Sequence, residues 1–176
     1  EIERLQDDFG YWLDTFPDGA FADSALYWKG MAALYQGDFA TALACFDRVE
    51  TDFPGSVYLT EVRFRRGVCH FGMGDHPEAL ALFTAWVAAN PAHPLRPEGE
   101  AFLGDLAAMD ARVDEAMAHY ARVEPLGGSE QLIDHATFEG ADLLVANRRW
   151  KELRAWLESY LQTHGSRQEA AEAGLQ

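Results

Sequence analysis

The chain has 176 residues, of which 48% are apolar, so it has enough apolar material for one domain core or for several stacked repeats. Its formal net charge is −15, and its only lysines are Lys29 and Lys151. This charge repels nucleic-acid phosphates and anionic lipid headgroups, and no apolar run approaches the roughly 20 residues that span a bilayer, which argues against nucleic-acid binding and direct membrane insertion.

The first predicted elements are helices joined by short turns. Residues 1–16 are predicted to form the second helix of a repeat, because their apolar positions recur 37 residues later. Residues 25–35 carry small and large apolar residues at helical spacing, which predicts the first helix of a new unit. Gly37 can take the left-handed conformation that ends a helix, and Asp38 is suited to cap the next one. That second helix is predicted over 39–52 and stops before a proline.

The same helix–turn–helix pattern continues to the end of the chain. Gly74-Asp75 repeats the turn, and Ser56 and Ser129 are predicted to cap first helices. In the fourth unit the sequence Asn147-Arg148-Arg149-Trp150 replaces the glycine–aspartate–aromatic turn. Ser166 opens a capping-box pattern that predicts a further helix start.

Four columns of residues keep the 37-residue step, with one shift to 36, and define its register. They are a glycine, an alanine, an aromatic and a proline–glycine column: Gly30, Gly67, Gly104 and Gly140; Ala42, Ala79, Ala116 and Leu153; Phe9, Phe46, Phe83, Tyr120 and Leu157; Pro17, Pro54, Pro91, Gly128 and Gly165. Glycine and alanine let two helix backbones approach closely, and we expect each ring to pack onto the next unit. The pattern predicts an all-α fold of stacked antiparallel helix hairpins.

These positions resemble the tetratricopeptide repeat. The residues that match its glycine, turn, aromatic, alanine and proline positions in two successive units are Gly30, Gly37, Phe39, Ala42, Phe46 and Pro54, then Gly67, Gly74, Ala79, Phe83 and Pro91. The resemblance implies a right-handed α-solenoid forming a single domain over residues 1–176. Its predicted parts are a half repeat 1–17, full repeats 18–54, 55–91, 92–128 and 129–165, and a partial repeat 166–176. The incomplete ends predict a fragment of a longer chain.

The repeat is three residues longer than the family's 34-residue period, with the additional residues between each proline and the next glycine. This pattern, with Phe-Pro-Gly-Ser and Phe-Pro-Asp-Gly junctions, is similar to the repeats of bacterial envelope proteins. Examples are the Tol-Pal coordinator and the lipoprotein of the outer-membrane barrel-assembly machine. The similarity implies a location in the bacterial periplasm or cell envelope, with the cytoplasm as the alternative.

Nothing in the sequence predicts catalysis, a metal site or a cofactor. The six histidines form no i, i+4 pair and no zinc-type spacing with cysteine. Cys69 and His70 are adjacent, so on a helix they point about 100° apart and cannot form a nucleophile–base pair. Cys45 and Cys69 are interpreted as small buried apolar residues, and a single bridge between them is the alternative.

The resemblance places a partner-binding groove on the first helix of each unit. The groove residues that it implies are Tyr27, Trp28, Met31, Phe64, Arg65, Phe71, Phe102 and Asp105, with Thr137, Glu139, Ala141 and Leu144 at the same positions of the fourth unit. Lysine and asparagine, which the family uses to clamp a terminal carboxylate, are missing there. The alternative is that several of these rings pack between helices.

The sequence therefore predicts a protein-interaction scaffold that binds another protein or peptide. Two other interpretations stay open: a self-associating structural array that forms homo-oligomers, and the regulatory repeat region of a larger enzyme. Arg63, Arg65 and Arg66 form the one dense basic cluster. It is interpreted as a solvated helix face paired with Glu61, or else as a docking point for a partner's carboxylate.

Overall fold

The computed structural model describes residues 9–13, 15–16 and 19–173. Every regular element in these ranges is a helix, which confirms the all-α prediction. The chain divides into two compact units, Glu1–Asn90 (unit 1) and Pro91–Gln176 (unit 2), and each is described by itself.

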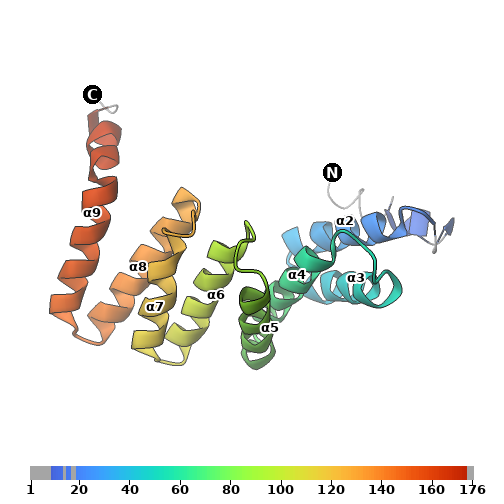
Figure 1. The fold of residues 1–176 in the computed structure, drawn as a ribbon, viewed down its shortest axis with the longest axis horizontal. Coiled ribbons are helices and arrows are strands. Elements are labelled where there is room, and N and C mark those ends of the chain that lie inside the picture. The colour runs from blue at the N-terminus through green and yellow to red at the C-terminus, as the bar shows by residue number, and fades with distance from the viewer. Residues whose placement is uncertain (1–8, 14, 17–18, 174–176) are drawn as a thin grey trace. The chain divides into compact units, whose positions relative to one another are not determined.

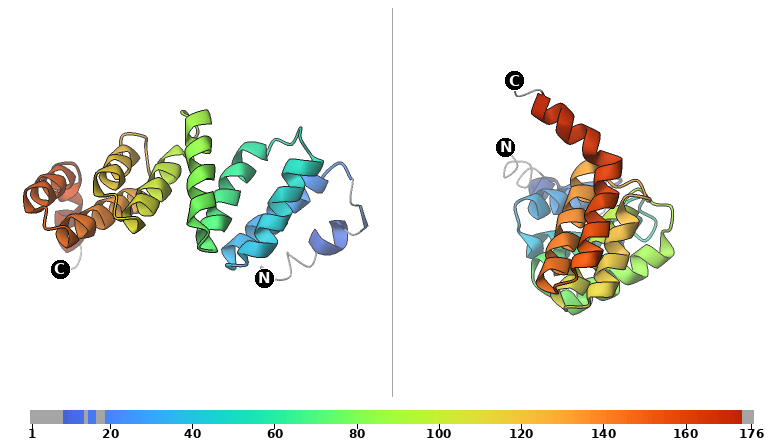
Figure 2. Two further views of the ribbon diagram at one scale, coloured as in Figure 1. Left: turned by 90° about the horizontal axis from the view of Figure 1, so that it is seen from below. Right: turned by 90° about the vertical axis from the view of Figure 1, so that its left-hand side faces the viewer.

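Unit 1 is built from antiparallel helices joined by short turns. Its helices are α2 (Ala22–Tyr35), α3 (Phe39–Asp52), α4 (Leu59–Gly72) and α5 (His76–Ala89), preceded by helical residues 9–13. Helix α3 packs on both α2 and α4, and α4 packs on α5 (Figures 1 and 2). The predicted helix over 39–52 is confirmed as α3. Of the predicted half repeat at the start of the chain, Leu5 and Pro17 lie outside the described residues.

Unit 2 has the same pairwise construction. Its helices are α6 (Arg96–Met109), α7 (Val113–Val123), α8 (Glu130–Ala146) and α9 (Trp150–Ala173). Helix α7 packs against both α6 and α8, which also touch each other, and α9 packs on α8 (Figure 1). The first helices of two successive repeats, α6 and α8, are therefore neighbours.

The turn between the two helices of a hairpin has the same geometry in all four predicted full repeats. Gly37 and Gly74 have φ values of +76° and +77°, and Ala111 and Arg148 occupy the same position with φ of +56°. In each turn the next residue donates its N–H to the carbonyl five residues back, as in the bond from Asp38 to Ala33 at 2.9 Å. The backbone turn therefore persists where the glycine is lost.

The predicted helix caps are confirmed in part. The Asp38 carboxylate accepts the Thr41 N–H at 3.1 Å, and Ser129 Oγ accepts the Leu132 N–H at 3.3 Å. Asp75 makes no cap bond with its side chain, which lies 3.0 Å from His70 Nδ1.

Two of the predicted helix starts are wrong. Ser56 lies in the turn before α4 and donates its hydroxyl to Asp23 at 2.7 Å, so α4 begins three residues later at Leu59. Helix α9 continues through Gly165 and Ser166 to Ala173 without a break. A glycine inside a helix costs only about 1 kcal/mol, and no proline stands there to enforce a stop.

The glycine and aromatic columns meet inside the first three hairpins. A Cβ added to Gly30 would lie 2.6 Å from Cε1 of Phe46, and one added to Gly67 would lie 2.9 Å from Cε1 of Phe83. Each ring thus lies over the glycine of its own hairpin, which corrects the prediction that it packs onto the next unit. The missing side chain creates the space for the ring at the helix crossing.

Candidate functional site

The predicted groove residues are divided between the two units. Tyr27, Trp28, Met31, Phe64, Arg65 and Phe71 lie on α2 and α4 of unit 1, and Phe102 and Asp105 lie on α6 of unit 2. Their surroundings decide which of them present a surface to a partner.

Three of the unit 1 residues are packed inside the unit. Phe64 is fully buried against Phe83 and Trp86, with ring centroids 5.3 Å and 4.9 Å away. Tyr27 and Met31 are also buried. These three residues pack between helices, which is the alternative to groove binding given in the sequence analysis.

Tyr27 ties α2 to the start of the next repeat. Its hydroxyl donates to Glu61 on α4 at 2.5 Å, and its ring stacks on Tyr58 with centroids 4.3 Å apart. Burial, and then the Glu61 carboxylate, raise the pKa of the Tyr27 hydroxyl well above its ordinary value. The hydroxyl therefore stays protonated and holds the two helices together as a donor.

The other three unit 1 residues reach the surface to different degrees. The Trp28 side chain is 50% exposed and stands edge-on to Tyr27 at 5.1 Å. The Arg65 guanidinium lies 5.4 Å from the centroid of the Phe64 ring, and the partly buried Phe71 ring lies 5.9 Å from His76. We call Trp28, Glu61 and Arg65 the α2–α4 face.

The basic cluster of α4 is engaged mainly with α3. Arg63 binds Glu50 at 2.8 Å, and Arg66 binds both Glu50 at 2.5 Å and Asp47 at 2.7 Å. Glu61, the partner expected from the sequence, accepts the Tyr27 hydroxyl. These ion pairs fix α4 on α3.

In unit 2 the predicted residues lie beside a cavity between α6 and α8, which we call the α6–α8 cavity. Its volume is about 420 Å³, which falls in the range of ligand-binding clefts. The lining residues come from α6 and from the beginning of α8: Glu98, Ala101, Phe102, Asp105, Ser129, Gln131, Leu132 and His135. Of these, the sequence predicts Phe102 and Asp105 as groove residues.

Asp105 is held in a fixed position at this cavity. Its carboxylate accepts the Tyr120 hydroxyl from α7 at 2.8 Å and lies 3.0 Å from His135 Nε2 on α8. Burial, followed by the charges of Asp105 and Glu139, raises the pKa of Tyr120 far above its ordinary value, so its hydroxyl remains a donor. One carboxylate therefore connects three helices while facing the cavity.

The groove residues predicted for the fourth repeat need a correction. Thr137, Ala141 and Leu144 are buried, whereas Glu139 is exposed. The exposed stripe of α8 runs through His135, Glu139 and Asp142, which share one face at helical spacing. A step of 37 residues from Glu98, Phe102 and Asp105 gives these three exposed positions. The 36-residue step that the glycine column makes leads instead to Gly140, which is buried.

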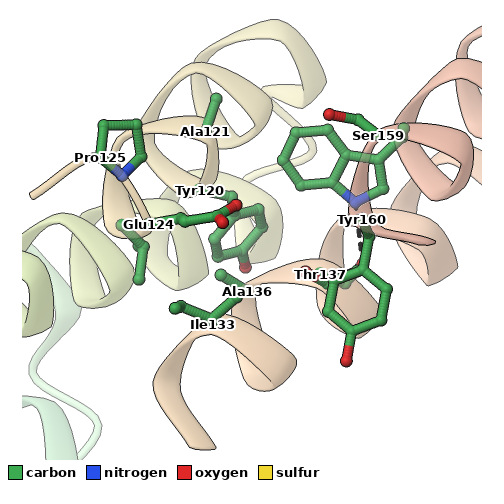
Figure 3. A pocket seen from close by; sticks show the side chains of 11 residues that line it. Tyr120, Ala121, Glu124, Pro125, Ile133, Ala136, Thr137, Ser159 and Tyr160 are labelled. Atoms are coloured by element: carbon green, nitrogen blue, oxygen red, sulfur yellow. Dashed lines mark hydrogen bonds between the residues drawn. The ribbon is translucent and has the colours of Figure 1, made fainter. Parts of the chain in front are cut away.

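A second, smaller cavity lies between α7, α8 and α9. Its volume is about 220 Å³, and Figure 3 shows residues of all three helices around it, with Glu124 of the α7 end on one side and Ser159 of α9 on the other. Glu124 lies 3.1 Å from the buried His164, and Trp156 donates its N–H to the Thr137 carbonyl at 2.9 Å. Its polar groups thus hold α9 in place.

Unit 2 also contains an ionic cluster around a buried carboxylate. Glu100 is 1% exposed and is contacted by Arg96 at 2.7 Å, His119 at 2.7 Å and Arg122 at 3.3 Å. Burial alone would raise the pKa of Glu100, but hydrogen bonds from His119, Arg96 and Arg122 outweigh it and lower the pKa to about 2. The cluster joins α6 to α7 and is structural.

Several other features bear on function. Among the described residues, no group of three or more His, Cys, Asp or Glu side chains is arranged to hold a metal ion. No helix in the described ranges is both long and apolar enough to cross a membrane. Cys45 and Cys69 are both free and buried, and burial raises the pKa of the Cys69 thiol to about 12, so neither thiol is poised to react.

Comparison with known proteins supports the same fold. A tetratricopeptide repeat model matches residues 19–57 and 27–94. A Podospora anserina chain described as a kinesin light chain with nearly identical TPR-like repeats superposes with a TM-score of 0.71 at 16% identity, covering 96% of this chain and 87% of that one. A search of curated proteins gave no match. The chain therefore has a tetratricopeptide-like helical repeat fold, which in general serves protein–protein interaction.

Proposed function

We propose that this protein is a non-catalytic scaffold that binds a segment of another protein on the exposed faces of its first helices. The observation that carries the proposal is the α6–α8 cavity. It lies between the first helices of successive repeats, with the apolar side chains of Phe102 and Leu132 beside the carboxylate of Asp105. An apolar cavity with a few fixed polar groups is the usual composition of a binding site.

The cavity is also held in shape before a partner arrives. Hydrogen bonds from Tyr120 and His135 fix Asp105, and α7 packs on both helices that form the walls. A site that is already ordered loses little conformational entropy on binding. The α2–α4 face of unit 1, with Trp28 and Arg65, is a second contact surface of the residue types that dominate interface energies.

Affinity capture from native lysate tests this function. We expect the intact chain to retain a partner that Phe102→Ala loses, because the substitution removes the apolar wall of the cavity. Trp150→Ala is the matched control, since Trp150 is an exposed aromatic residue at the start of α9, outside the cavity lining. Circular dichroism must show equal helicity in all three proteins. Capture of the same partner by Phe102→Ala would exclude the cavity as the binding site.

Self-association is a second candidate, favoured by the aromatic residues at the beginning of unit 1. An apolar cavity of about 350 Å³ is lined by Phe9, Trp12 and Phe21, and the Phe21 side chain is 70% exposed. Contiguous exposed apolar surface of this kind is typical of interfaces. Light scattering over a range of concentrations separates the two functions, because an adaptor keeps the monomer mass and a self-associating array does not.

The bacterial envelope remains our proposal for the location. It rests on the Phe-Pro-Gly-Ser and Phe-Pro-Asp-Gly junctions and on the 37-residue period. Fractionation of the native cells tests it, and recovery in the cytoplasmic fraction would reject it.

A further inference from the structure

We propose that the partner segment bound between α6 and α8 is cationic and amphipathic, with an apolar side chain in the cavity and flanking Lys or Arg side chains on the surrounding carboxylates. This inference rests on the proposed function and specifies the chemistry of its partner. Two independent observations carry it: the shape and lining of the cavity, and the distribution of charge on the two helices that form its walls.

The charge of α8 is entirely negative. The helix carries four carboxylates and no lysine or arginine over Glu130–Ala146. Two of these carboxylates, Glu139 and Asp142, lie on the same exposed stripe as His135, which lines the cavity. A partner that follows this stripe therefore passes successive negative charges.

The wall that α6 forms, opposite α8, also carries carboxylates. On α6, Glu98 and Asp105 line the cavity on either side of Phe102. The one arginine of α6, Arg96, is bound to the buried Glu100 and belongs to the ionic cluster with α7. The two walls thus combine an apolar centre with carboxylates on both sides.

Asp105 can accept further hydrogen bonds. A carboxylate has about four acceptor positions, and those of Asp105 receive the Tyr120 hydroxyl and the His135 ring nitrogen. The side chain keeps 17% of its surface exposed. A guanidinium or ammonium group would add a charge-assisted hydrogen bond to an acceptor that is already oriented.

The same charges disfavour other occupants. An acidic peptide or a nucleic acid would be repelled by both walls. A second copy of this chain would bring its own formal charge of −15 to a negative face. A cationic amphipathic segment is the occupant that complements both the apolar centre and the carboxylates.

Two synthetic peptides test the proposal with the full chain. Both have 14 residues and the same leucine positions, and the remaining positions are all lysine in one and all glutamate in the other. Fluorescence anisotropy measures binding at low and high salt. We expect the leucine–lysine peptide to bind and to weaken at high salt, and the leucine–glutamate peptide not to bind.

Charge-matched variants separate this face from the general acidity of the chain. We expect Glu139→Gln/Asp142→Asn to weaken binding of the leucine–lysine peptide by about fivefold or more. The control is Glu78→Gln/Glu115→Gln, which removes the same charge from exposed positions on α5 and α7. We expect it to change the affinity by less than about twofold, because neither position lies on the exposed stripe of α8 or lines the cavity.

The remaining outcomes are decisive. Equal losses in the two double variants would overturn the proposal, because binding would then follow net charge alone. Binding of the leucine–glutamate peptide with dependence on Phe102 would overturn the cationic partner and leave the scaffold function standing. If neither peptide binds, the cationic inference fails, and the lysate capture with Phe102→Ala then decides the scaffold function separately.

Discussion

At the scale of single residues, the turn positions Ala111 and Arg148 show that the turn geometry is kept where the glycine is replaced. Both have φ of +56°, the left-handed conformation that Gly37 and Gly74 adopt in the first two units. Residues with a Cβ pay roughly 1–2 kcal/mol for this conformation. The surrounding hydrogen bonds, such as Arg149 N–H to the Leu144 carbonyl at 2.9 Å, maintain it nevertheless.

This geometry predicts that Ala111→Gly stabilises the protein by about 1 kcal/mol, because glycine adopts positive φ without a steric cost. Urea unfolding measures the change. The converse substitution, Gly37→Ala, is the matched test, since no atom beyond the two adjacent residues lies within 4 Å of the added Cβ and only the backbone conformation opposes it. We expect it to destabilise by a similar amount. If Ala111→Gly and Gly37→Ala changed the free energy of unfolding in the same direction, or not at all, the account of the turn would be contradicted.

The buried Glu100 gives a pH-dependent prediction. Its folded pKa of about 2 lies below the ordinary value of 4.5, so its ionised form contributes about 3 kcal/mol above pH 4.5. That contribution is lost as the pH falls towards 2. We therefore expect Glu100→Gln to lower the free energy of unfolding at pH 7, and the gap to the native protein to narrow as the pH falls.

Urea unfolding at pH 7, 4 and 3 measures this gap. The exposed Glu115→Gln is the control, and we expect it to change stability by less than about 1 kcal/mol at each pH. A gap that stays constant from pH 7 to pH 3 would show that the ionic cluster does not hold Glu100 in its charged form.

At the scale of the helices, the contact between the glycine of a first helix and the ring of the second sets the distance in each hairpin. A Cβ at Gly30 would lie 2.6 Å from Phe46, closer than a van der Waals contact. We expect Gly30→Ala to destabilise the protein by about 1–3 kcal/mol, because overpacking exceeds the gain in helix propensity. Thermal unfolding measures this. Gly55→Ala, in an open turn, should be close to neutral, and an equal effect would contradict the packing account.

The helices also show which structural features could be predicted from the sequence and which could not. Period and turn residues located α3 to the residue, because Gly37-Asp38 and Pro54 mark both of its ends. No such marker decides which face of a first helix is buried, so the sequence predicts Phe64 and Tyr27 as groove residues although they pack between helices. The continuous α9 was missed because Gly165 has the spacing of a stop signal without the backbone geometry of one.

At the scale of the whole molecule, the repeat and the all-α fold followed from the sequence, whereas the proposed binding surface required coordinates. Phe102 and Asp105 could be selected from the register of the repeat. Their neighbours Leu132 and His135 could not, because they reach the cavity from the beginning of the next first helix. The charge of the chain contributed in another way, since it argued against nucleic-acid binding at the outset and then supported our proposal of a cationic partner once the carboxylates of α6 and α8 were located.

The most direct test of the central claim is photo-crosslinking in native lysate. A photoreactive amino acid replaces Gln131, which is exposed and lines the α6–α8 cavity, and in a second protein it replaces Lys151, which is exposed near the start of α9. We predict a specific protein crosslink from position 131 and none from position 151. Crosslinks from position 151 alone, or from both positions equally, would contradict the claim that this cavity is where the scaffold holds its partner.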